Sequence, residues 1–326
     1  MSRIVVIGAT GHVGGYLVPR LVRAGHDVVA ISRGIRKPYR QDDAWSSVSR
    51  VDLDREAGDA DGSFAGAISD LAADVVIDMM CFTEDSAAQL VEALRGRVDQ
   101  LLSCGTIWVH GPATAVPTTE ADERTPFGEY GVGKAAIEKL LRAESSRPGG
   151  LRSTVLHPGH ITGPGWPMVN AAGNFDLAVW ETLAAGSPLT LPNLGLETVH
   201  HVHADDVAQA FERATERPDL AAGKSYHVVS ERAMTLRGIA QTAAGWFGQE
   251  AQLDYLPFDE FLSRLPDEHA AATRDHVSRS PSMSIAAAVS DLGYAPRYTS
   301  AAAIADGLQW LIADGQVDTG GRPLQA

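Results

Sequence analysis

The chain has 326 residues, enough for one large or two medium domains, and its 44% content of hydrophobic residues suffices for a buried core. Its net charge of −14, from 41 acidic and 27 basic residues, disfavours a nucleic-acid partner, because binding phosphates requires clustered cations. No run approaches the roughly 20 apolar residues of a membrane span, so no membrane partner is expected. Neither a secretory leader nor a disulfide framework is evident, so we expect a cytoplasmic protein.

The chain begins with a short apolar segment that runs into a glycine-rich turn. Residues 3–7 have the β-branched composition of a strand buried on both faces of a parallel sheet. Three glycines follow, which allow a sharp turn, close approach of a pyrophosphate and close packing of the next helix. A helix over about 12–24 and a strand over 27–32 complete a βαβ unit. The unit predicts a dinucleotide site at Gly8, Thr10, Gly11, His12, Val13 and Gly14.

The end of the second strand indicates which nucleotide binds. In NAD sites a carboxylate here binds the ribose hydroxyls, whereas this chain has Ser32 followed by Arg33, with Arg36 close behind. A carboxylate would repel a 2′-phosphate, but a guanidinium can pair with it through two hydrogen bonds. We therefore predict that these residues contact the cofactor and that NADP(H) is preferred, with NAD(H) possible. The alternative is that Arg33 is a solvated loop residue.

The rest of the amino-terminal half continues to alternate strands and helices. Strands are predicted near 48–52, 74–79, 98–104 and 151–157, with a helix near 84–95. This alternation predicts an α/β fold built on a Rossmann-type doubly wound parallel sheet.

Tyr130 and Lys134 stand four residues apart in a predicted helix over 129–143 and therefore share one face of it. With seven Tyr and four Lys in the chain, random placement would give only about 0.1 such pairs, so the spacing is informative. The ordinary pKa of a phenol is near 10. A nearby ammonium and a bound nicotinamide would favour the phenolate and bring that pKa toward neutral pH. The pair predicts proton transfer by Tyr130, with Lys134 also able to donate to a nicotinamide ribose.

After residue 158 the sequence becomes rich in turns. A helix at about 176–185 and a strand at 196–203 follow, then a helix that starts at Asp205 and Asp206, as acidic residues favour. A last sheet strand is predicted at 225–229, and the remainder is largely helical. We expect a dinucleotide-binding domain of residues 1–158 plus about 196–230. A smaller, mostly helical substrate domain would contain about 159–195 plus 231–326.

The chain resembles the extended short-chain dehydrogenase/reductase family, also called the NAD-dependent epimerase/dehydratase family, over nearly its whole length. The motifs occur in family order: the glycine loop, Asp52-Leu53, Thr106 to Gly111, Tyr130 with Lys134, 157–165 and 203–207. The resemblance implies that Thr106 holds the substrate oxygen while Tyr130 moves the proton; the alternative is a hydroxyl that caps a loop. It also implies a homodimer built on the helix at 84–95 and the Tyr-Lys helix. Further implied cofactor contacts are Asp52, Leu53, Met79, Lys134, His157 and Gly159.

Two departures from the family narrow the chemistry. Sugar-nucleotide dehydratases carry a carboxylate directly after the catalytic Thr, where this chain has Ile107 and Trp108, so elimination by that route is not expected. Sugar-nucleotide epimerases usually carry a diphosphate-binding Arg about four residues before His203, where this chain has none. That absence favours a smaller or less charged substrate. His201 and His203 would share a strand face, but no further ligands complete a metal site, so no metal is predicted.

The leading functional hypothesis is an NAD(P)-dependent reductase or dehydrogenase acting on a small carbonyl/alcohol pair, with Thr106, Tyr130 and Lys134 as the catalytic residues. An NAD-dependent epimerase using the same three residues is one alternative. A non-catalytic, nucleotide-sensing relative is another. A pocket that suits an apolar or cyclic small-molecule substrate would be lined by His110, Trp166, Met168, Asn174, Phe175 and His201.

Overall fold

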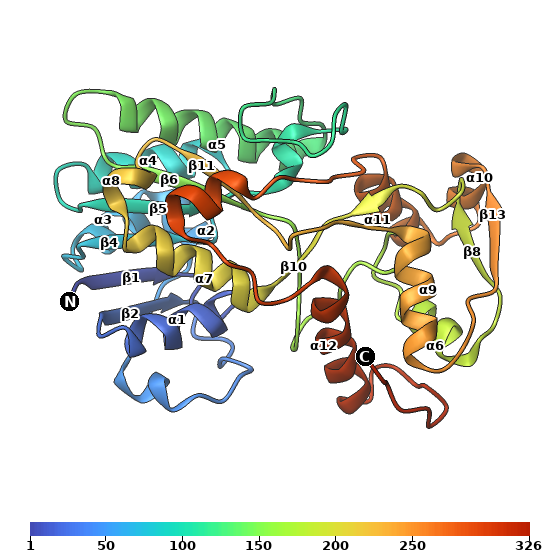
Figure 1. Ribbon diagram of the computed structural model, residues 1–326. Coiled ribbons are helices and arrows are strands. Elements are labelled where there is room, and N and C mark those ends of the chain that lie inside the picture. The colour runs from blue at the N-terminus through green and yellow to red at the C-terminus, as the bar shows by residue number, and fades with distance from the viewer.

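Seven parallel strands form one sheet, with helices on both faces, in the computed structural model of residues 1–326 (Figure 1). The strand order is β11-β6-β5-β4-β1-β2-β3. The strands span, in that order, Ser225–Val228, Ser153–Pro158, Gln100–Cys104, Val75–Asp78, Arg3–Ile7, Asp27–Ser32 and Ser49–Asp52. The strand order reverses between β1 and β4, which is where ligands bind in open α/β sheets. The predicted fold class, a Rossmann-type doubly wound α/β sheet, is therefore confirmed.

The composition of β1 explains why both faces of the sheet are covered. Ile4 and Val6 pack into one apolar cluster with α1 and α7, whereas Val5 and Ile7 pack into another with α3, α4 and α5. Successive side chains of a strand point to opposite faces, so a continuously apolar strand requires helices on both. The helices of this part are α1 (Gly14–Arg23), α2 (Arg55–Asp61), α3 (Ser63–Ser69), α4 (Glu84–Leu94), α5 (Gly128–Ser146) and α7 (Ala204–Thr215).

A second apolar core lies beside the sheet, on the right in Figure 1. It is built around the buried Trp180 and Leu308 and contains no residue of the large sheet. Its helices are α6 (Ala178–Ala185), α9 (Leu236–Trp246), α10 (Phe258–Ser263), α11 (Asp267–Val277) and α12 (Ser300–Ala313).

Three pairs of short strands accompany this second core. β7 (His160–Thr162) pairs with β10 (His201–His203), β8 (Leu189–Pro192) with β13 (Leu253–Leu256), and β9 (Thr198–Val199) with β12 (Met234–Thr235). The shorter elements are α8 (Pro218–Ala221), the 3-10 helices η1 (Asp43–Ser47) and η2 (Ile107–His110), and the π-helix η3 (Ala288–Leu292). None of the helices is both long enough and apolar enough to cross a membrane.

Two features differ from the sequence-based expectation. The strand predicted over 196–203 is two strands, because β9 pairs antiparallel with β12 whereas β10 pairs parallel with β7. Residues 288–294, which we expected in the smaller domain, pack in the core of the large sheet. There Leu292 and Tyr294 join the cluster around Phe211, and the Tyr294 hydroxyl donates to the Val229 carbonyl oxygen at 3.0 Å.

Candidate active site

The glycine loop after β1 forms a cradle of free backbone N–H groups. Gly8 has a φ of +85°, and a Cβ at Gly14 would lie 2.3 Å from the Ala9 carbonyl oxygen, so both positions require glycine. The N–H groups of His12, Val13 and Gly14 donate to no acceptor within the protein. They lie at the start of α1, where the helix dipole favours anions. The cradle therefore fits the pyrophosphate of a dinucleotide.

The next two strand ends place polar and charged side chains beside this loop. Ser32 ends β2, and its hydroxyl accepts a hydrogen bond from the Gly34 N–H at 3.2 Å. Arg33 and Arg36 are exposed and form no ion pair with a carboxylate of the protein. Asp52 ends β3 so close to Gly34 that a Cβ there would lie 2.6 Å from its carboxylate. Two exposed arginines without a carboxylate partner thus follow β2, and the Asp52 carboxylate lies beside Gly34 of the same loop.

Helix α5 directs Tyr130 and Lys134 toward the end of β5. Lys134 is 2% exposed, and its Nζ donates to the Cys104 carbonyl oxygen at 2.7 Å. The same Nζ lies 5.7 Å from the centroid of the Tyr130 ring. Thr106 follows β5 and caps η2, with its Oγ1 accepting from the Trp108 N–H at 3.3 Å. A phenol, a hydroxyl and an ammonium are therefore brought together at the carboxyl end of the sheet.

The surroundings of Tyr130 keep its phenol protonated. Burial and the neighbouring Cys104 thiol raise its pKa to about 12, although the Thr106 hydroxyl opposes the increase. The residue as a whole is 42% exposed, and its ring packs edge-on against Trp108, with 5.7 Å between centroids. At neutral pH the group can therefore donate a proton.

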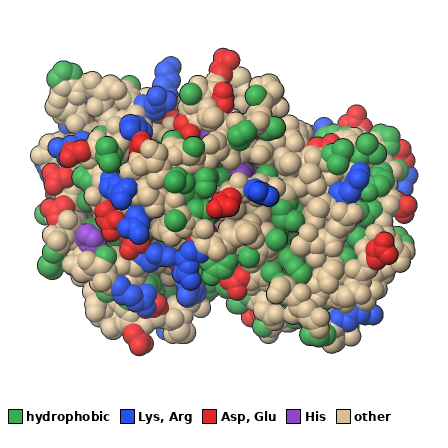
Figure 2. Space-filling view, viewed as in Figure 1, with side chains coloured by type: hydrophobic (Ala, Val, Ile, Leu, Met, Phe, Trp, Pro, Cys, Tyr) green, Lys and Arg blue, Asp and Glu red, His purple; other side chains and the backbone are tan.

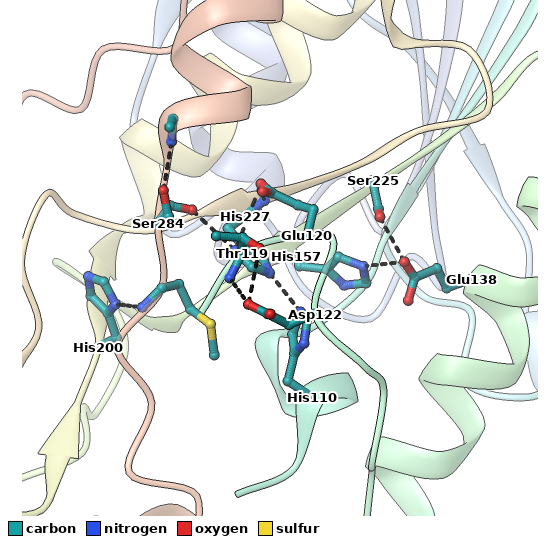
Figure 3. Close-up of polar contacts among 12 residues, drawn as sticks. His110, Thr119, Glu120, Asp122, Glu138, His157, His200, Ser225, His227 and Ser284 are labelled. Atoms are coloured by element: carbon teal, nitrogen blue, oxygen red, sulfur yellow. Dashed lines mark hydrogen bonds and ion pairs between the residues drawn. The ribbon is translucent and has the colours of Figure 1, made fainter. Parts of the chain in front are cut away.

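A buried ionic network behind these residues supports Thr106, and sequence reasoning missed it. Figure 3 shows His157, Glu138 and Ser225 of this network. His157 Nδ1 accepts from the Thr106 N–H at 3.0 Å, so the ring proton belongs on Nε2, which points toward Glu138 at 3.4 Å. Glu138 also accepts from Arg124 and Ser225, each at 2.7 Å. Burial opposes ionisation, yet His157 and Arg124 hold the pKa of Glu138 far below its ordinary value. The spacing of Glu138, four residues after Lys134 on one helix face, is the signal that could have revealed it.

Two predicted site residues lie within this buried polar region. His157, predicted as a cofactor contact, is fully buried with its ring turned to Thr106. His110, predicted as a substrate contact, is 4% exposed, and its Nε2 lies 2.8 Å from the Nε2 of His227. Figure 3 shows the His110 and His227 rings pointing toward one another.

The predicted pocket residues separate into exposed and buried groups. Trp166 and Phe175 are 46% and 41% exposed, and Trp166 lies against His12 of the glycine loop, with 5.3 Å between ring centroids. Met168 belongs to the second apolar core. Asn174 is buried, and its Nδ2 donates to Thr273 Oγ1 at 3.1 Å.

A separate cavity of about 540 Å³ lies over α1 and α7, and none of its lining residues belongs to the predicted site. Arg20 pairs there with Asp205 and Glu212, and Arg23 pairs with Asp42. Figure 2 shows basic and acidic side chains interspersed on the visible face. The arginines around this cavity are largely neutralised by carboxylates and do not form a continuous cationic surface.

The chain matches one protein-family model and is similar to several known proteins. The model of the NAD dependent epimerase/dehydratase family matches residues 4–228. A 2′-dehydrokanamycin reductase from Streptomyces kanamyceticus is 28% identical over 81% of this chain and 72% of its own. The chloroplast stem-loop binding protein of 41 kDa b from Arabidopsis thaliana is 26% identical over 78% of this chain and 66% of its own. The UDP-glucose 4-epimerase of Thermotoga maritima, solved with UDP-glucose, has the same fold, with a TM-score of 0.73 and 17% identity over 96% of this chain and 99% of its own.

Proposed function

Because the chain belongs to the NAD-dependent epimerase/dehydratase family, we propose that it is an oxidoreductase that transfers hydride between NADP(H) and a small carbonyl or alcohol substrate. The observation that carries this proposal is the convergence of Tyr130, Lys134 and Thr106 after β5, at the same carboxyl end of the parallel sheet as the glycine loop after β1. The dinucleotide, when bound, supplies or accepts the hydride. The similarity to a 2′-dehydrokanamycin reductase supports a reductase.

The three side chains have separate roles in this proposal. Thr106 holds the substrate oxygen by hydrogen bonding. Tyr130 gives its hydroxyl proton to that oxygen in reduction and takes it back in oxidation. Lys134 lies near the phenol ring and is anchored on the Cys104 carbonyl, so its charge favours the phenolate that remains after proton donation. His157 and Glu138 hold the backbone at Thr106 in place.

The raised pKa of Tyr130 predicts opposite pH profiles for the two directions. Reduction needs the phenol, which is the populated form below a pKa of about 12. We expect kcat/KM for NADPH-dependent carbonyl reduction to stay constant from about pH 6.5 to 9, because this parameter reports the free enzyme. Oxidation of the matching alcohol needs the phenolate and should rise about tenfold per pH unit over the same interval. Initial rates in both directions would test this, and a reduction rate that falls above pH 8 would contradict it.

A cofactor preference for NADP(H) follows from the two free guanidinium groups after β2. Arg33→Ala should weaken NADPH binding about tenfold or more, the size of one charge-assisted hydrogen bond, and leave NADH binding within twofold. Fluorescence titration of both nucleotides against wild type and variant measures the ratio. Arg322→Ala, far along the sequence at the carboxyl terminus, is the matched control. An unchanged NADPH/NADH ratio would show that Arg33 is a solvated loop residue.

An epimerase built on the same residues is the second candidate, and the shared fold with the Thermotoga enzyme is the observation that favours it. Such an enzyme returns its cofactor unchanged and so has no need to release it. Mass spectrometry of the nucleotide freed by denaturing fresh protein distinguishes the two. Stoichiometric NAD⁺ would favour the epimerase, whereas a site that exchanges NADPH freely favours the reductase.

The similarity to a stem-loop binding protein keeps a non-catalytic role as a further alternative. Absence of turnover with every carbonyl tested, together with retained nucleotide binding, would favour it.

We also propose a homodimer formed by α4 and α5, which pack side by side and leave Ala88 and Val132 exposed.

A further inference from the structure

Three buried histidine rings from three different elements meet beside the candidate site. His160 on β7 lies between His276 on α11 and His201 on β10, with ring centroids 5.2 Å and 5.9 Å apart. The His276 ring contacts Trp108 and Phe175, each at 5.3 Å between centroids. Since Trp108 itself packs against Tyr130, a continuous series of ring contacts connects the histidines to the phenol.

Backbone carbonyl groups determine which nitrogen of each ring carries the hydrogen. His160 Nδ1 lies 3.2 Å from the His200 carbonyl oxygen, and His201 Nε2 lies 2.9 Å from that of Val169. His276 Nδ1 lies 3.0 Å from the carbonyl oxygen of Gly173. A carbonyl oxygen can only accept, so each of these nitrogens must be an N–H donor. In a neutral ring the second nitrogen is then a lone pair that can only accept.

The three rings are held in the neutral form. Burial lowers the pKa of His160 far below its ordinary value and that of His201 to about 4, and it lowers the pKa of His276 as well. Their mutual proximity acts in the same direction, because a second positive charge would be repelled. The cluster therefore has three acceptor nitrogens, and its three N–H groups already donate to backbone carbonyl oxygens.

Two of these acceptors have no partner in the protein. His160 Nε2 and His201 Nδ1 are buried and form no hydrogen bond. The neighbouring strand histidines differ: His200 accepts from the Met283 N–H and faces the Ser230 carbonyl, and both nitrogens of His203 are likewise paired. Buried acceptors are seldom left without a donor in native proteins. The missing donors can come from a bound ligand.

No guanidinium beside the cluster is free to bind an anion. Arg279, which packs against Trp108, is 1% exposed, and its Cζ lies 3.8 Å from that ring and 3.7 Å from the Phe127 ring. Its terminal nitrogens donate to the backbone carbonyls of Asp275 and Phe127. The imidazole lone pairs, with no cation beside them, repel phosphate oxygens. Hydroxyl and amine groups, in contrast, can donate hydrogen bonds to these lone pairs.

We propose that His160, His201 and His276 bind hydroxyl or amine groups of the substrate, and that the substrate is a polyhydroxylated or amino-substituted cyclic carbonyl rather than a nucleoside diphosphate sugar. The inference rests on the proposed function, because it assigns the substrate class of the same site. Trp108 and Phe175 suit the apolar face of such a ring, and the imidazoles receive its polar edge. The sequence predicted a pocket for an apolar or cyclic substrate. The proposed pocket instead has apolar rings against the face of the substrate ring and hydrogen-bond acceptors against its edge.

A matched pair of ketones tests the inference. Cyclohexanone has no hydroxyl donors, whereas scyllo-inosose has the same ring with a hydroxyl on each remaining carbon. The wild-type protein should reduce scyllo-inosose with NADPH at a kcat/KM at least about tenfold higher than that for cyclohexanone. His160→Leu should lower kcat/KM for scyllo-inosose about tenfold and leave that for cyclohexanone within twofold. His160→Gln, whose amide oxygen can accept, should recover part of the loss.

The outcomes separate this inference from the proposed function. Cyclohexanone turnover reports hydride transfer without the imidazoles, so an equal loss on both ketones in His160→Leu would overturn the substrate assignment alone. If neither ketone is reduced, the proposed function fails, and calorimetry of the NADPH-bound protein with myo-inositol and UDP-glucose decides the assignment. Tighter binding of myo-inositol, lost in His160→Leu, supports it, and tighter binding of UDP-glucose overturns it. Should His160→Leu not fold, His276→Leu takes its place in both measurements.

Discussion

Tyr130→Phe is expected to reduce NADPH-dependent turnover by about 10²–10⁴-fold, the range for loss of a positioned acid or base. The substitution removes one oxygen and keeps the ring that packs against Trp108 and Phe82. Nucleotide affinity should therefore stay within about twofold, as the glycine loop and the end of β2 are untouched. Steady-state kinetics and an NADPH titration on the same preparation measure the two quantities separately.

Tyr255→Phe is the matched control for this experiment. Tyr255 lies on β13 and is 37% exposed, and its ring rather than its hydroxyl contacts the Arg237 guanidinium. Turnover of this variant should match the wild type. If Tyr130→Phe instead lost nucleotide binding and turnover together, the residue would have a structural role, and the assignment of the proton donor would have to be abandoned.

Local sequence patterns were sufficient to predict the sheet and the glycine-rich turn that follows its first strand. The β-branched run of β1, the glycines after it and the apolar stripe of α1 are close in sequence, so their spacing reports their geometry directly. The same holds for Tyr130 and Lys134, which one helix turn places on one face. These features depend on secondary structure alone.

Contacts between distant segments could not be predicted in this way. The hydrogen bond from the Thr106 N–H to His157 spans 51 positions, and His160 meets His276 only because β7 and α11 pack together. Met168 illustrates the same limit, because an apolar residue in a turn-rich segment has the same sequence signature in a core as in a pocket. The acceptor character of the histidines depends on which backbone carbonyl each ring faces, and no spacing in the sequence encodes that.

Glu138→Ala is expected to lower the free energy of unfolding by about 3–5 kcal/mol, the usual cost of breaking a buried ion pair from one side. Both Arg124 and His157 would lose their carboxylate partner inside the protein, and only part of the Arg124 charge could reach solvent. Urea denaturation at neutral pH measures the change. Glu260→Ala, which removes an exposed carboxylate paired with Arg264, should change stability by no more than about 0.5 kcal/mol.

The pH dependence of this loss distinguishes a charge effect from a packing effect. The folded-state pKa of Glu138 is depressed far below the unfolded value near 4.3, so ionisation stabilises the fold above that unfolded value. The contribution is lost as pH falls from there toward the folded pKa. The difference between wild type and Glu138→Gln, which keeps the shape of the side chain, should therefore be constant from about pH 6 to 8 and shrink below about pH 4. A difference independent of pH would mean that Glu138 stabilises Thr106 and His157 through the geometry of its hydrogen bonds rather than through its charge.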